Sequence, residues 1–204
     1  MTSRREFLEI GIAASTWPLA THAARAAGLG EISSAELRRE PVPLYKVIYD
    51  TRFPQSVAFG RRAAALGVDA HAIEGDMTRL WFDDVYHRWK QAPAAIAGLT
   101  AHGPLFCFER LAWDQGLRVV FRAEHGCDAA GALTHALSGP RSLLAAARGA
   151  LARTDWNAAM AEVVTQCPSG KAELDSIEIA SPGAAGTLAT EPLYSWVIAR
   201  AART

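Results

Sequence analysis

The short motifs of common enzyme classes are missing from this sequence, and cysteine is scarce. The 204 residues include three cysteines, none in a C-x-x-C pair. Spacing therefore supports neither a cysteine zinc site nor c-type haem attachment. The stretch Asp50-Thr-Arg-Phe-Pro-Gln-Ser56 follows the first expected strand where a dinucleotide-binding fold would carry G-x-G-x-x-G. No G-x-x-x-x-G-K-[ST] loop and no G-x-S-x-G elbow occurs either. The cofactor stays unassigned.

Charge is balanced, and long apolar runs are absent. The chain carries 21 basic and 21 acidic residues, so it has no basic field to attract nucleic acid or anionic lipid. A membrane-spanning helix needs roughly 20 consecutive apolar residues, and no such run occurs. We therefore expect no nucleic-acid partner and no stable membrane insertion. Half of the residues are apolar, which is typical of a compact globular protein.

The first ten residues carry a recognisable pattern. Ser3-Arg-Arg-Glu-Phe-Leu8 precedes a short, interrupted apolar segment, and Ala24-Arg-Ala26 fits a small-x-small cleavage site. This segment resembles a twin-arginine (Tat) export signal, which is an address and not an anchor. The resemblance implies export of an already folded protein to the periplasm. It also implies that the Tat translocon is a partner during export and that the signal is cleaved near Ala26.

Residues 27–43 are rich in glycine, serine, charge and proline, which is typical of a linker or arm. Residues 44–204 then form the expected domain. Apolar runs and turn residues predict strands at 44–49, 69–73, 94–100 and 117–123, with helices at 54–66, 77–91 and 104–115 between them. This alternation predicts a single three-layer α/β domain with a mainly parallel, Rossmann-like sheet.

The pattern changes after residue 127. Residues 129–137, 142–151 and 156–164 are predicted to be helical, and 175–180 and 193–199 to be strands. A turn-rich loop separates the last two strands, so we expect them to form an antiparallel pair at one edge of the sheet.

Ionisable residues follow four consecutive strands of the predicted sheet, where ligands bind in open α/β folds. We assign candidate catalytic roles to Asp50, His102 and His125, as acids or bases. The candidate ligand-binding residues at the same strand ends, for a small polar or anionic ligand, are Arg52, Asp76, Thr100 and Gly103. The same residue types also cap helices and form turns, so a structural interpretation stays open.

The predicted helix 77–91 is rich in aromatic residues. Phe82, Tyr86 and Trp89 lie on one apolar stripe, which is typical of a core helix or of a helix that docks a protein partner. Asp83, Asp84 and His87 have the spacing of a metal-binding face, but a solvated charge pair is the favoured interpretation.

The three cysteines differ in their predicted environments. Cys127 and Cys167 fall in predicted loops and are the best-placed pair for a disulfide. Cys107 lies in Leu105-Phe-Cys-Phe108, where we expect it to be buried as a small apolar residue.

Two classes of function fit these observations. The first is an exported accessory or small-ligand-binding protein, such as a partner of a periplasmic redox enzyme, because no catalytic signature is present. The alternative is a small periplasmic enzyme, a hydrolase or oxidoreductase, that uses the Asp, His and Arg residues at the strand ends.

We expect the mature chain to begin near Ala27. Mass spectrometry of the protein purified from periplasm under native conditions should give the mass of the chain without residues 1–26, and it would also reveal any bound ligand. An intact N-terminus on the periplasmic protein would contradict the signal assignment.

Overall fold

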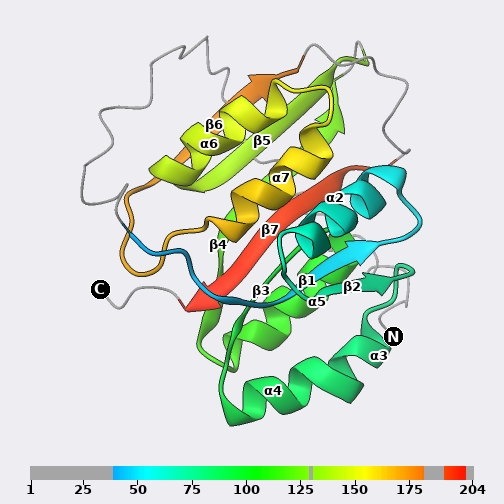
Figure 1. Cartoon of the computed structure of the whole chain (residues 1–204), viewed down its shortest axis with the longest axis vertical. Coiled ribbons are helices and arrows are strands. Elements are labelled where there is room, and N and C mark those ends of the chain that lie inside the picture. The colour runs from blue at the N-terminus through cyan, green and yellow to red at the C-terminus, as the bar shows by residue number, and fades with distance from the viewer. Residues whose placement is uncertain (1–38, 129–130, 182–190, 201–204) are drawn as a thin grey trace, which may run out of the picture. The chain divides into compact units, whose positions relative to one another are not determined.

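The fold is given by a computed structural model that describes residues 39–128, 131–181 and 191–200. Within them, seven strands form one mixed sheet in the order β2-β1-β3-β7-β4-β5-β6. Helices pack on both faces of this sheet (Figure 1). The expected signal, residues 1–26, and most of the expected arm, residues 27–43, lie outside the described residues.

The strands are β1 (Leu44–Asp50), β2 (Ala70–Ile73), β3 (Ala95–Thr100), β4 (Leu117–Cys127), β5 (Leu133–Pro140), β6 (Leu174–Ala180) and β7 (Leu193–Arg200). The helices are α2 (Pro54–Ala65), α3 (Thr78–Leu80), the π-helix η1 (Trp81–Val85), α4 (Tyr86–Gln91), α5 (His102–Trp113), α6 (Arg141–Leu151) and α7 (Trp156–Thr165). The predicted alternation of strands and helices from 44 to 123 is confirmed. In the described part of the chain, no helix has the length and apolar character needed to span a bilayer.

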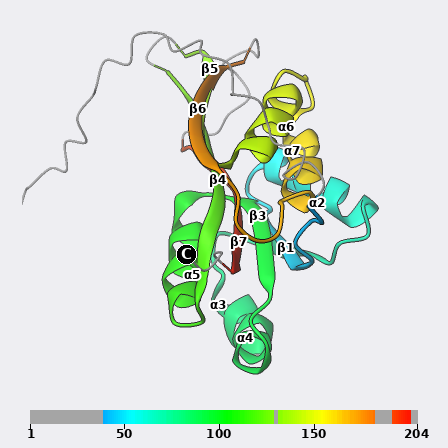
Figure 2. The same cartoon turned by 90° about the vertical axis from the view of Figure 1, so that its left-hand side faces the viewer.

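The first four strands all run in one direction. β1 is parallel to both of its neighbours, β2 and β3. β4 has the same direction because β3 and β4 are each antiparallel to β7, which lies between them. Helix α2 covers one face of the sheet, and α5 covers the other (Figure 2). The α/β class of the prediction is therefore confirmed.

The prediction of a mainly parallel sheet is not confirmed, because β7 lies in the middle of the sheet. Four of the six pairings between named strands are antiparallel, and two are parallel. The predicted antiparallel pair of the last two strands is wrong, since β6 pairs with β5 at the sheet edge. Every residue of β7 except Arg200 is buried, as expected for a continuous apolar run covered on both faces.

The predicted helix at 129–137 is also wrong. Residues 129–130 lie outside the described part, and β5 begins at Leu133 and pairs antiparallel with β4. The alanines of the segment 129–137 favour helix by propensity. However, Leu133, His135 and Leu137 are buried while the residues between them are more exposed, which is the period of two of a strand covered on one face. Burial of this face overrides the local preference.

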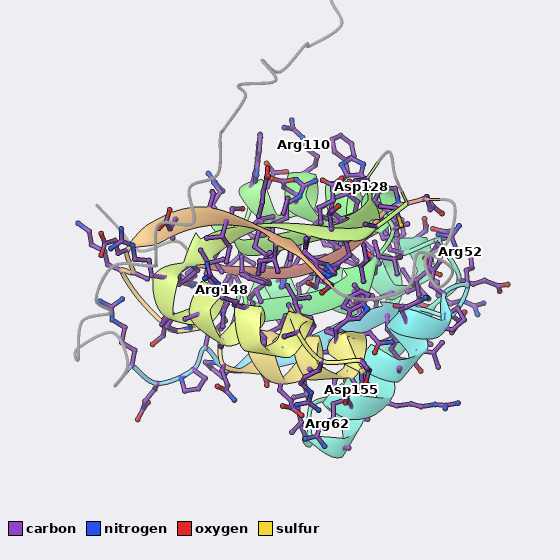
Figure 3. The ribbon with its side chains drawn as sticks, turned by 90° about the horizontal axis from the view of Figure 1, so that it is seen from above. Arg52, Arg62, Arg110, Asp128, Arg148 and Asp155 are labelled. Atoms are coloured by element: carbon purple, nitrogen blue, oxygen red, sulfur yellow. The ribbon has the colours of Figure 1, made fainter. Side chains whose placement is uncertain are left out.

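The two faces of the sheet have separate apolar cores. Ile48, Ile96 and Trp196 belong to the core under α5 and the α3–η1–α4 helix. On the other face, α2 packs against α7, and α6 packs beside α7 over β5 and β6 (Figure 2). Arg62 of α2 and Glu162 of α7 form an ion pair of 2.7 Å. Figure 3 shows Arg62 and Asp155 close together where α2 meets α7.

The helix at 78–91 contains one π-helical turn, and its aromatic residues differ in burial. Trp89 is only 1% exposed and belongs to the core, whereas Phe82 is 60% exposed. Asp84 accepts a hydrogen bond from Tyr45 and forms an ion pair of 3.1 Å with Lys46. In the described ranges, no group of three His, Cys, Asp or Glu side chains is arranged to hold a metal ion.

Gly98 lies where β3 contacts both β1 and the Trp196 ring. A Cβ at this position would lie 2.6 Å from the backbone oxygen of Ile48 and 2.6 Å from the Trp196 ring. Backbone atoms cannot yield to this contact, so Gly98→Ala should lower the free energy of unfolding by about 2–4 kcal/mol.

Gly149→Ala is the control for this prediction. Gly149 is exposed on α6, and no atom lies within 4 Å of the position that a Cβ would occupy there. The substitution should therefore be neutral or stabilising by up to about 1 kcal/mol. Urea unfolding of both variants gives the comparison, and a Gly98→Ala variant as stable as wild type would contradict the packing.

Candidate functional site

Asp50 and Arg52 form an ion pair with each other at the end of β1. Asp50 is fully buried, and its carboxylate accepts hydrogen bonds from Arg52 Nη2 at 2.7 Å and Nε at 3.0 Å. The hydrogen bond to Asp50 raises the pKa of Arg52. The Asp50 amide donates to Ser56 Oγ at 2.7 Å, and Ser56 donates to the Leu99 carbonyl. These contacts connect β1, α2 and β3, so the pair already has a structural role.

Arg52 is also fixed by the turn that follows β2. Gly75 has φ +77°, and a Cβ there would lie 2.6 Å from Arg52 Cζ. Only glycine accepts both this backbone conformation and this contact without strain. Figure 3 labels Arg52, which lies just before α2. Its guanidinium is therefore held by Asp50 and is not free to bind a ligand through that edge.

His102 lies on the α5 face of the sheet. It is the first residue of α5 and is exposed. Its ring stacks on Phe106 at 6.0 Å and meets the edge of the Tyr194 ring at 5.4 Å. The Arg122 guanidinium lies 4.8 Å from the Tyr194 ring centroid. Burial, with a further contribution from Glu124, raises the pKa of Tyr194.

The other predicted ligand-binding residues differ in their surroundings. Thr100 is buried, donates to the Ala101 carbonyl at 2.9 Å and accepts from Trp196 Nε1 at 3.1 Å. Asp76 accepts the amide of Thr78 at 2.8 Å, and hydrogen bonds from Thr78 lower the pKa of Asp76. Gly103 is exposed at the start of α5 with open space around it.

His125 lies inside β4 and is completely buried, against the sequence-based expectation of a strand-end residue. Its Nδ1 lies 2.8 Å from His135 Nδ1, and its Nε2 lies 2.8 Å from Ser195 Oγ. The Trp156 ring of α7 packs 4.5 Å from the His125 ring. His135 Nε2 is buried without a hydrogen-bond partner among the described residues.

The protonation states of His125 and His135 follow from the unpaired His135 Nε2. An unpaired buried N–H is rarer and more costly than an unpaired acceptor. The arrangement is therefore best satisfied when His135 Nδ1–H donates to His125 Nδ1 and His125 Nε2–H donates to Ser195 Oγ. Both rings are then neutral. Burial lowers the pKa of His125 well below its usual value and that of His135 to about 4.

The structure does not bring the three predicted catalytic residues together. His102 contacts Tyr194, and His125 contacts Ser195, the next residue of β7. Because successive strand residues face opposite sides of a sheet, the sheet itself separates the two imidazoles. Asp50 is occupied by Arg52. Their catalytic roles stay predictions, without a shared site.

A large cavity lies at the end of the sheet that is opposite to Asp50 and Arg52, where β1, β3 and β4 begin and β7 ends. Its volume is about 1030 Å³, and it was not predicted. Apolar residues dominate its lining: Val42, Pro43, Leu44, Tyr45, Pro93, Ala94, Ala95, Val119, Val120, Pro140, Pro168, Ala172, Leu174 and Ala199. We call this the amino-edge cavity. A pocket of this size and composition is typical of small-ligand sites.

Two β-bulges contribute to the amino-edge cavity. The register of β1 against β3 shifts between Leu44 and Lys46, and the register of β4 against β7 shifts between Val119 and Phe121. The extra residues, Tyr45 and Val120, both line the cavity. Bulges are over-represented beside functional sites because they bend a strand and redirect its side chains.

A short piece of the expected arm forms one wall. The Val42 amide donates to the Cys167 carbonyl at 2.8 Å, and the Ser169 amide donates to the Glu40 carbonyl at 3.1 Å. Residues 40–43 are thereby fixed to the segment between α7 and β6. Cys167 is buried, and burial raises the pKa of its thiol to about 12.

The prediction that Cys107 is buried is wrong, and the candidate disulfide is not formed. Cys107, Cys127 and Cys167 are all free, so Cys127 and Cys167 form no disulfide. Cys107 lies on the outward face of α5 and is exposed. The α5 helix directs Leu105 and Phe108 into the core and leaves Cys107 in solvent.

Four cations and no acidic residue lie among the lining residues of the amino-edge cavity. They are Arg88, Arg118, Lys171 and Arg200, and all four are exposed at its rim. No single segment of the sequence indicates this group, because its members come from four different parts of the chain.

Comparisons with protein-family models, curated proteins and solved structures found no match to this chain.

The buried His125–His135 pair predicts a loss of stability in mild acid. An unfolded histidine binds a proton near pH 6.5, whereas folded His135 does so only near pH 4. The stability that neutral His135 contributes is therefore complete above pH 6.5 and is lost as the pH falls to about 4, by roughly 3 kcal/mol. Urea unfolding at intervals between pH 7 and pH 4 measures it, and the part lost above pH 5, about 2 kcal/mol, precedes the loss from paired carboxylates. His87→Gln, an exposed control, should retain the loss; equal stability at pH 7 and pH 4.5 would contradict the prediction.

Proposed function

We propose that this chain is an exported small-ligand-binding or accessory protein whose ligand binds in the amino-edge cavity. One observation carries the proposal. The cavity has a volume of about 1030 Å³ and a mainly apolar lining, and the bulges of β1 and β4 both contribute to it. Apolar lining provides affinity for a small molecule, and a few polar groups orient it.

Binding is favoured over catalysis by the distribution of the ionisable residues. General acid–base catalysis needs its groups within hydrogen-bond or one-water reach of the substrate. His102 and His125 contact opposite faces of the sheet, and Asp50 is paired with Arg52. The enzyme alternative, with Asp50, His102 and His125 in one site, therefore has less support than ligand binding.

The proposal includes export to the periplasm in a folded state. Its support is the resemblance of residues 1–26 to a twin-arginine signal. A domain that binds its ligand in a preformed cavity would gain from being folded before export. Periplasmic delivery would also place the cavity where extracytoplasmic small molecules are met.

An accessory role through protein docking is the second candidate. Phe82 is 60% exposed on η1, where the sequence predicts a docking helix. Its predicted companion Trp89 is buried in the core, and Tyr86 is partly buried against the same core. A single exposed aromatic supports a smaller docking surface than the predicted stripe, so ligand binding in the cavity ranks first.

We expect the mature chain to bind the uncharged dye N-phenyl-1-naphthylamine with a rise in dye fluorescence. Val120→Trp and Ala172→Trp, on different walls of the cavity, should each weaken this binding at least tenfold by filling the space. Both side chains are partly exposed, so the larger ring need not disrupt the core.

Val57→Trp is the matched control, because Val57 is equally half-buried but lies on α2 outside the cavity lining. It should bind dye as wild type does. Urea midpoints identify any variant that fails to fold. The proposal fails if wild type does not bind the dye, or if both cavity variants bind it with wild-type affinity.

A further inference from the structure

The rim of the amino-edge cavity is positively charged, whereas the chain as a whole is nearly neutral. Without residues 1–26, the chain carries 18 basic and 19 acidic residues. Four of the basic residues, but no acidic residue, are among those that line the cavity. They come from α4, β4, the segment before β6, and the end of β7. A one-signed rim on a neutral chain favours a ligand of the opposite sign.

Arg118 is held in place by uncharged groups. Its Nη1 donates to the Leu117 carbonyl at 2.7 Å and to the Trp113 carbonyl at 3.4 Å. The Trp113 ring lies 5.8 Å from its Cζ. These contacts orient the guanidinium but do not neutralise it, and the described residues form no ion pair with it.

Arg88 is oriented in a similar way. Its Cζ lies 5.2 Å from the centroid of the Tyr45 ring, and Tyr45 is the bulge residue that lines the cavity. Five other arginines of the described chain have acidic partners: Arg52, Arg62, Arg79, Arg141 and Arg153. Arg88 and Arg118 have none in the same ranges, so both retain edges that can bind an anion.

The ligand must also have an apolar body. Exposed cations bind a small hydrated anion weakly, because water and salt screen the attraction. The large apolar interior would then stay unused. A carboxylate attached to an aliphatic or aromatic body satisfies both parts, since guanidinium groups match carboxylates in a two-pronged geometry.

We propose that the amino-edge cavity binds carboxylic acids with an apolar body, and that Arg88 and Arg118 bind the carboxylate at its rim. This inference rests on the proposed function and specifies the ligand class of the same site. It assigns the apolar lining to the body of the ligand and the two unpaired guanidiniums to its head.

Matched probes separate the two contributions. Decanoate and decan-1-ol have the same number of carbon atoms but differ in charge, and both are titrated into the full mature chain by displacement of N-phenyl-1-naphthylamine. We expect decanoate to bind about tenfold more tightly than decan-1-ol. Octanoate should bind about fifteenfold more weakly than decanoate, because it lacks two methylenes and each buried methylene contributes about fourfold.

Arg88→Gln with Arg118→Gln should remove the preference for the acid and leave decan-1-ol binding unchanged. Arg148→Gln, an exposed arginine on α6 outside the cavity lining, is the control and should keep the preference. Equal affinity of wild type for acid and alcohol overturns the inference while the proposed ligand-binding function stands. Bound dye that neither probe displaces also overturns the inference, whereas a wild type that does not bind the dye contradicts the proposed function itself.

Discussion

The burial of β7 between β3 and β4 is the constraint on which the rest of this structure depends. Every residue of β7 from Leu193 to Ala199 is buried, and its backbone pairs with both neighbours. Trp196 fills the core under α5, whereas Ser195 faces α7 and receives a hydrogen bond from His125. One strand thus stabilises both layers of helices. Because side chains alternate along it, it also separates the polar groups of the two faces.

The same strand explains why the two edges of the sheet differ. At the carboxyl ends of β1 and β3, polar side chains are already paired: Asp50 with Arg52, and Thr100 with Trp196. At the opposite edge, β7 ends where β1 and β4 each carry a bulge. The cavity opens there, with apolar walls and a cationic rim. Ligand binding is therefore proposed at the edge opposite to the usual site of open α/β sheets.

The sequence predicts the elements from 44 to 123 well, because prolines and glycines bound each apolar run and the helical and strand periods are clear. The sequence-based prediction fails where the pairing of strands distant in the chain determines the structure. Residues 193–199 form a continuous apolar run, which is the pattern of a central strand, but nothing local indicates its partners. The alanine-rich segment 129–137 has a local preference for helix, but burial of His135 and Leu137 stabilises the strand instead. The cavity was out of reach for the same reason, since Tyr45, Arg88, Val120 and Lys171 meet only in the folded chain.

A crystal structure of the mature chain grown with decanoate tests the central claim most directly. The account predicts the alkyl chain in the amino-edge cavity against Val120 and Leu174, with the carboxylate within hydrogen-bond distance of Arg88 or Arg118. Decanoate bound at the other edge of the sheet, beside Arg52 or Arg122, with none in the cavity, would contradict it.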